Sequence, residues 1–140
     1  MPVVIPDKLH RLIVALYEHA GVKQEDAIII ADHQVASHLA GHDSHGVHLL
    51  PTYLERIKKG HIVPNASMEI LDETPTTARV DGHWGFGQVI STRAMELCIA
   101  KARQNRVGVV SVFRQSHVGR LGDYPLMAAR VGLVGMMRGG

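Results

Sequence analysis

Hydrophobic residues in the first half of the chain recur every three or four positions, a spacing that predicts amphipathic helices. The first predicted helix starts at Asp7, the expected N-cap, and ends at Gly21. Its hydrophobic face comprises Leu9, Leu12, Ile13, Leu16 and Tyr17. The second covers about residues 25–39. Its expected buried stripe comprises Ile28, Ala31, Val35 and Leu39. A third helix begins near Pro51 and ends at Gly60.

The second half of the chain has a different pattern, in which short hydrophobic runs alternate with helical segments. The predicted elements are, in order, strands at 68–71 and 77–81, a glycine-rich turn at 82–87, a helix at 88–106, a buried strand at 107–113, a helix at 124–130 and a strand at 133–137. This alternation favours an α/β layer. We therefore predict a helical N-terminal lobe over residues 1–67, followed over residues 68–140 by the start of an α/β domain.

Composition narrows the classes of function. The chain has 46% hydrophobic and 20% charged residues, which is typical of a soluble globular protein. Its 15 basic and 13 acidic residues are scattered, and aromatic residues make up 4%, so no nucleic-acid partner is expected. No hydrophobic run approaches the roughly 20 residues that span a bilayer, so no membrane partner is expected. The start lacks a secretory signal, and the single Cys98 suits a reducing compartment, which favours a cytoplasmic location.

Two motifs suggest chemistry that their details argue against. Gly85-Phe86-Gly87 lies between a predicted strand and a helix, as in a dinucleotide-binding turn, but Ile90 occupies the position of the third glycine. A tight turn that requires glycine is the simpler interpretation. His42, His45 and His48 have a spacing that suits a metal site. Gly46 interrupts any helix there, and no His-Glu-x-x-His pattern supports zinc, so no metal site is predicted.

The strongest candidate chemistry belongs to two loops, residues 41–46 and 115–119, each of which follows a regular element. His45 and His117 are suited to proton transfer, because imidazole titrates near neutrality. Asp43 or Ser44 is close enough in sequence to orient His45 by hydrogen bonding, and the arginines that flank His117, Arg114 and Arg120, are suited to holding an anion. The alternative at this stage is a pair of structural loops with charged rims.

Four motifs in order resemble the type 2 malate/L-lactate dehydrogenase family, and its hydroxycarboxylate dehydrogenase branch in particular. The motifs are Gly41-His42-Asp43-Ser44-His45-Gly46-Val47, Leu50-Pro51-Thr52-Tyr53-Leu54, Asp81-Gly82-His83-Trp84-Gly85-Phe86-Gly87-Gln88 and Ser116-His117-Val118-Gly119-Arg120. The resemblance implies a mixed-sheet nicotinamide-binding domain unrelated to the Rossmann fold. It also implies a homodimer that oxidises small 2-hydroxy acids, or reduces 2-oxo acids, with NAD or NADP.

Roles for individual residues follow from the same resemblance. It implies that His117 is the general acid/base, that His45 and Ser44 lie beside the substrate and the nicotinamide, and that Tyr53 lines the substrate side. Many members carry an arginine two positions before the proline that matches Pro51, and this chain has Leu49 there. His48 and Arg120 are then the candidates for binding the substrate carboxylate. No residue is assigned to the rest of the cofactor.

Family chains are longer than 140 residues, so the resemblance implies an N-terminal portion that is inactive alone. Two other functions remain open at this stage. One is a truncated, non-catalytic interaction module with exposed hydrophobic surface. The other is a metal-dependent hydrolase.

Overall fold

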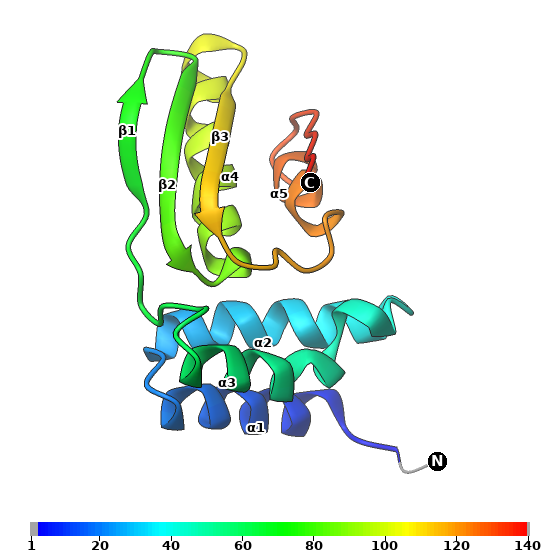
Figure 1. Ribbon diagram of the computed structural model, residues 1–140. Coiled ribbons are helices and arrows are strands. Elements are labelled where there is room, and N and C mark those ends of the chain that lie inside the picture. Colours follow the sequence, from blue (N-terminus) through cyan, green and yellow to red (C-terminus); the bar gives the residue numbers. More distant parts are fainter. Residues whose placement is uncertain (1–2, 140) are drawn as a thin grey trace. The chain divides into compact units, whose positions relative to one another are not determined.

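The computed structural model describes residues 3–139, whose contacts group into two compact units, one up to Asn65 and one from Ala66 onward. The first unit holds helices α1 (Pro6–His19), α2 (Gln24–Leu39) and α3 (Leu50–Lys58), with the short 3-10 helices η1 (Asp43–His45) and η2 (Val47–Leu49) between the last two. The second holds strands β1 (Glu69–Glu73), β2 (Thr77–Gly85) and β3 (Val109–Gln115), and helices α4 (Gly87–Asn105) and α5 (Asp123–Ala129) (Figure 1). The expected α/β class, a helical region followed by a mixed sheet, is confirmed.

The three predicted N-terminal helices are present, but the start of α1 differs from the prediction. The N-cap is Ile5, Pro6 occupies the first turn, and no side chain caps the helix. Asp7 lies inside the first turn, where its negative charge interacts favourably with the partial positive charge of the helix N-terminus. The proline explains the shift, because its fixed φ favours the first helical position.

The predicted hydrophobic faces of α1 and α2 are only partly buried. Ile13 and Tyr17 lie in the core, whereas Leu12 is 56% exposed. On α2 the predicted stripe is only partly correct: Ala31 is completely buried, whereas Leu39 is 70% exposed and the polar Gln34, outside the stripe, is completely buried. Gln34 Oε1 accepts a hydrogen bond of 3.2 Å from the Tyr17 hydroxyl, which offsets the cost of burying that oxygen. Burial, reinforced by nearby Tyr53, raises the pKa of Tyr17.

The sheet has the order β1-β2-β3, with β1 antiparallel and β3 parallel to β2. Helix α4 packs against β2 and β3, and buries Ala78 and Val80 of β2 together with its own Val89 and Ile90. The predicted glycine-rich turn is instead the end of β2. There residues 82–84 bulge opposite Arg114 alone, and His83, Trp84 and Arg114 all have positive φ.

Two predictions for the last third of the chain are wrong. The predicted buried strand begins two residues later, as β3, and Val109 and Phe113 on it are 58% and 38% exposed. The cause is its place at the edge of the sheet, with α4 over one face. Residues 133–137 form no strand among the described residues. Leu133 and Met137 pack instead on a cluster of Met95, Tyr124 and Ala128, and no ladder partner orders them into a sheet.

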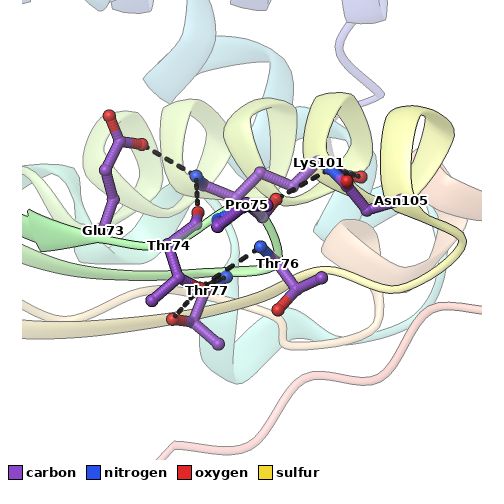
Figure 2. A network of polar contacts seen from close by, with 7 residues as sticks. All are labelled: Glu73, Thr74, Pro75, Thr76, Thr77, Lys101 and Asn105. Atoms are coloured by element: carbon purple, nitrogen blue, oxygen red, sulfur yellow. Dashed lines mark hydrogen bonds and ion pairs between the residues drawn. The ribbon is translucent and has the colours of Figure 1, made fainter.

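The end of α4 is joined to the turn between β1 and β2 by polar contacts (Figure 2). The ammonium group of Lys101 is 2.7 Å from Glu73 Oε2 and donates a hydrogen bond of 2.7 Å to the carbonyl oxygen of Thr74. Asn105 Nδ2 donates to the carbonyl oxygen of Pro75 at 2.9 Å. These contacts fix α4 against the sheet at the end opposite its N-terminus.

None of the helices in residues 3–139 has the length and hydrophobicity that a membrane-spanning helix needs.

Candidate functional site

His45 is the last residue of the short helix η1. This helix follows α2 after a turn at Gly41, which has a positive φ. Its Nδ1 and the Ser44 hydroxyl oxygen are hydrogen-bonded at 2.8 Å, so Ser44 rather than Asp43 is the neighbour that orients the ring. The Asp43 carboxylate lies 3.6 Å from Nε2 of His38 instead. His45 is half-buried, and Ser44 is exposed. The Ser44 hydroxyl therefore contacts the ring at Nδ1, on a partly open surface.

The other candidate residues of the helical unit differ in accessibility. His48 is exposed on η2, where a small anion can reach it. Tyr53 is 1% exposed and lies near Tyr17 in the core of the helices. The aromatic ring of Tyr53 therefore contributes to the packing of the helical core.

The loop that carries His117 is held by backbone and side-chain hydrogen bonds to neighbouring elements. The backbone N–H of Ser116 donates to the carbonyl oxygen of Gly85 at 3.0 Å. The Ser116 hydroxyl accepts a hydrogen bond of 3.1 Å from the backbone N–H of Gly87, the first residue of α4. One turn further along α4, the Ser91 hydroxyl donates to Gln115 Oε1 at 3.0 Å. The end of β2 and the start of α4 thus fix the backbone directly before His117.

Gly87 is required by this close approach. A Cβ atom there would lie 2.3 Å from the carbonyl oxygen of Ser116 and 2.4 Å from that of His117. The expected reason for glycine, a backbone conformation that other residues avoid, does not apply to Gly87, which has no positive φ. The backbone N–H of Gly87, at the start of α4, already donates to the Ser116 hydroxyl, so a phosphate there would have to displace that hydroxyl.

The imidazole of His117 is exposed and is contacted at its Nδ1 edge. The backbone N–H of Gly119 donates to Nδ1 at 3.3 Å, so the neutral ring carries its proton on Nε2. Gly119 has a φ of 73°, which lets the chain turn back toward the ring. Because 3.3 Å is a long hydrogen bond, the tautomer is only weakly fixed.

The two arginines that flank His117 are both paired with carboxylates. Arg114 Nε donates to Asp81 Oδ1 at 3.1 Å, and a second contact joins Nη2 to Oδ2. Asp81 is almost completely buried, and the hydrogen bonds from Arg114 lower its pKa from 3.8 to about 2. Arg120 pairs with Asp123 through Nη2 and Oδ1. An anion that binds either guanidinium must therefore share it with a carboxylate.

One group of side chains has the ligand types of a metal site. Among the described residues, Glu69, Asp81 and His83 place one ligand atom each within 4.8 Å of the others. This group does not include His42, His45 or His48. Arg114 already neutralises Asp81, and a cation at the cluster would have to compete with that guanidinium.

The sequence did not identify several residues that position the two loops. His38, Ser91 and Asp81 act on the loops from other elements, so no local pattern points to them, and Gly87 was expected to be a glycine for a different reason. The one available signal was glycine, because Gly46 and Gly87 each stand next to polar loop residues in the sequence. His45 belongs to the helical unit and His117 to the α/β unit.

Comparison with known proteins places these loops in a family. A sequence profile of malate/L-lactate dehydrogenase matches residues 4–138. The chain is 40% identical over 130 residues to a malate dehydrogenase of Pyrococcus abyssi, covering 93% of this chain and 36% of that protein. It is 36% identical over 126 residues to hydroxycarboxylate dehydrogenase B of Escherichia coli, covering 90% of this chain and 35% of that protein.

A comparison with solved structures supports the same family. The structure of malate dehydrogenase from Pyrococcus horikoshii matches with a TM-score of 0.90 at 39% identity, over 92% of this chain and 37% of that one. The chain thus spans little more than a third of the length of these relatives. Over nearly all of its own residues it shares their sequence pattern and fold, and it belongs to the malate/L-lactate dehydrogenase family.

Proposed function

We propose that this chain forms the N-terminal portion of an NAD- or NADP-dependent dehydrogenase of small 2-hydroxy acids, with His117 as its general acid/base. The observation that carries the proposal is the anchoring of the His117 loop. An exposed imidazole is held on a backbone fixed to β2 and α4 by Ser116, which is the kind of support that a proton-transfer group requires. The names of the relatives support the substrate class.

The reaction divides into a hydride step and a proton step. A bound nicotinamide supplies the acceptor for the hydride that leaves C2 of the hydroxy acid, or the donor in reverse. His117 takes up the hydroxyl proton in oxidation and returns a proton to the oxo oxygen in reduction. Nδ1 faces the backbone N–H of Gly119, so we place this exchange at Nε2, which can accept a proton only in the tautomer that carries the ring proton on Nδ1. With its proton on Nε2, the ring is ready to polarise an oxo group, and uptake of a hydroxyl proton requires the weak Gly119 contact to open.

Ser44 and His45 are proposed to lie beside the substrate and the nicotinamide, and Tyr53 to support that side from the core. His48, which is exposed, is available to the substrate carboxylate. Arg120 is a second candidate, and the substrate would then compete with Asp123 for its guanidinium. We assign no residue to the cofactor phosphates, and the backbone N–H of Gly87 at the start of α4 is already bonded to the Ser116 hydroxyl.

In this proposal residues 1–67 are a helical lobe that contributes Ser44 and His45, and residues 68–140 begin the catalytic domain that contributes His117. The longer protein is expected to be a cytoplasmic homodimer.

The test compares the 140-residue chain with a protein that carries it at the length of its relatives. The longer protein should transfer hydride between a 2-hydroxy acid such as malate or lactate and NAD or NADP. His117→Ala should lower its kcat by about two to four orders of magnitude, with nucleotide affinity little changed. His19→Ala, at the exposed end of α1, is the matched control. The proposal fails if His117→Ala retains turnover within about threefold of the parent. The 140-residue chain alone should show no turnover.

A second candidate function, a module that self-associates, is favoured by exposed hydrophobic surface. A groove of about 780 Å³ lies between α4, β3 and residues 132–138. Val134 and Met136, which line it, are almost completely exposed to solvent. Burying such surface contributes roughly 25 cal/mol per Å², so we expect two copies to pair through this groove. Light scattering should give a mass above the 15.3 kDa of one chain, and a monodisperse monomer would contradict this expectation.

A further inference from the structure

His38 lies in the last turn of α2 and contacts the His45 loop on both sides of His45. The backbone N–H of Val47 donates to its Nδ1 at 3.3 Å. Its Nε2 lies 3.6 Å from Asp43 Oδ1. Because Nδ1 accepts a hydrogen bond, the neutral ring carries its proton on Nε2, on the side of the carboxylate. One ring therefore meets a donor after His45 and an acceptor before it.

Gly46 makes this arrangement possible. It is buried, and a Cβ atom there would lie 2.2 Å from Nδ1 of His38 and 3.1 Å from Cγ. The imidazole thus occupies the space that any other residue at position 46 would fill. The backbone N–H of Gly46 donates to the carbonyl oxygen of Asp43 at 3.0 Å, which closes the turn around Ser44 and His45.

We propose that His38 is a positioning residue, which sets the conformation of the loop from Asp43 to Val47 and so the orientation of His45. It acts through the loop backbone and takes no part in proton transfer, since its nitrogens face Val47 and Asp43. Its effect on catalysis rests on the proposed function, whereas its effect on the loop does not. The ring is also a better anchor than a longer side chain, because it is planar and fits against Gly46.

Nuclear magnetic resonance on the 140-residue chain tests this role without any need for turnover. Three variants are compared with the parent: His38→Ala, His38→Asn and His42→Ala. Asparagine places an oxygen acceptor near the position of Nδ1, so it can keep the hydrogen bond from Val47. His42 is an exposed histidine of the same loop, and its replacement controls for loss of an imidazole nearby.

We expect His38→Ala to speed hydrogen exchange of the Val47 amide about fivefold, as befits the loss of one ordinary hydrogen bond, and to shift the ring signals of His45. His38→Asn should restore most of the Val47 protection, and His42→Ala should leave it unchanged. In the parent, the ring nitrogen shifts of His38 should report an unprotonated Nδ1, a readout that needs no variant.

The inference is overturned if Nδ1 of His38 is protonated in the neutral ring, or if His38→Ala leaves both the Val47 amide and the His45 ring unchanged. Turnover of the longer protein then separates the two proposals. A fall in kcat for His38→Ala that His38→Asn partly rescues supports both. The full change in the resonance signals with unchanged kcat supports the positioning role and counts against a catalytic role for His45.

Discussion

The two histidine loops are held in place by different means. The loop of His117 is bonded through its backbone and Ser116 to β2 and α4, and Gly87 lies against its carbonyl oxygens. The loop of His45 is closed by hydrogen bonds within its own backbone, and the side chain that contacts it from α2 is His38, which is partly exposed. A loop fixed by backbone has few ways to adjust, whereas a loop fixed by a surface side chain can follow that side chain. We infer that the His117 loop is the rigid one and the His45 loop the adjustable one.

The largest difference is expected between alanine substitutions at the two glycines. Gly87→Ala places a methyl group against backbone carbonyls 2.3 and 2.4 Å away, which cannot move without shifting the loop. Gly46→Ala places one against the His38 ring, which can rotate away. Overpacking of this kind costs about 1–3 kcal/mol, and we expect Gly87→Ala at the upper end and Gly46→Ala at the lower.

Urea unfolding of the two variants at neutral pH measures this difference as a change in the free energy of unfolding. Gly122→Ala serves as a control, because a Cβ atom at Gly122 meets nothing within 4 Å. If Gly46→Ala proves the more destabilising of the two, the order of rigidity given above is reversed.

How far the sequence predicts this arrangement depends on where each residue finds its partner. Helices and strands followed from periodicity, which is a local property. The buried face of α2 did not, because Gln34 is buried through a bond to Tyr17, on another helix. Residues 133–137 have the composition of a strand, but a strand also needs a neighbour, which a local pattern cannot supply.

The candidate site divides in the same way. His45 and His117 were found because histidine beside glycine in a loop is a local signal. Ser44 was correctly considered as the partner of His45, and the structure distinguishes it from Asp43. His38 acts on its loop through contacts that no sequence pattern marks, and Gly87 was expected to be glycine for its backbone conformation, not for a close contact. Only the folded chain brings Gly87 to the carbonyl oxygens of residues 116 and 117.

The two loops should also differ in how low pH affects their contribution to the free energy of unfolding. The folded-state pKa of Asp81 is about 2, below its ordinary value of 3.8, chiefly because of the hydrogen bond from Arg114. A carboxylate with a depressed pKa stabilises the fold fully above its unfolded pKa and loses that contribution as pH falls through the folded value. The Asp81–Arg114 pair, which borders the His117 loop, should therefore lose its contribution between about pH 4 and pH 2.

Urea unfolding of Asp81→Asn and of the parent across this range checks the expectation. The variant should be less stable than the parent at pH 6, and the gap should narrow as the pH falls below about 4. Asp43→Asn in the other loop is the control, since the Asp43 side chain is 78% exposed and an exposed pair contributes little. A constant gap between Asp81→Asn and the parent from pH 6 to pH 2 would rule out this titration as the source.

The smallest expected difference separates the two serines that precede the histidines. The hydroxyl of Ser116 accepts the backbone N–H of Gly87 at the start of α4, so Ser116→Ala removes the partner of a part-buried donor and should cost about 1 kcal/mol. The hydroxyl of Ser44 bonds only across the surface to His45 among its described contacts, and Ser44→Ala should cost less than about 0.5 kcal/mol. The changes in the histidine ring signals should have the opposite order. Ser44→Ala should shift the His45 ring signals more than Ser116→Ala shifts those of His117, because Ser44 contacts the imidazole of His45 directly whereas Ser116 acts on His117 through the backbone. If Ser44→Ala leaves the His45 ring signals unchanged, the hydrogen bond from Ser44 does not orient that ring in solution.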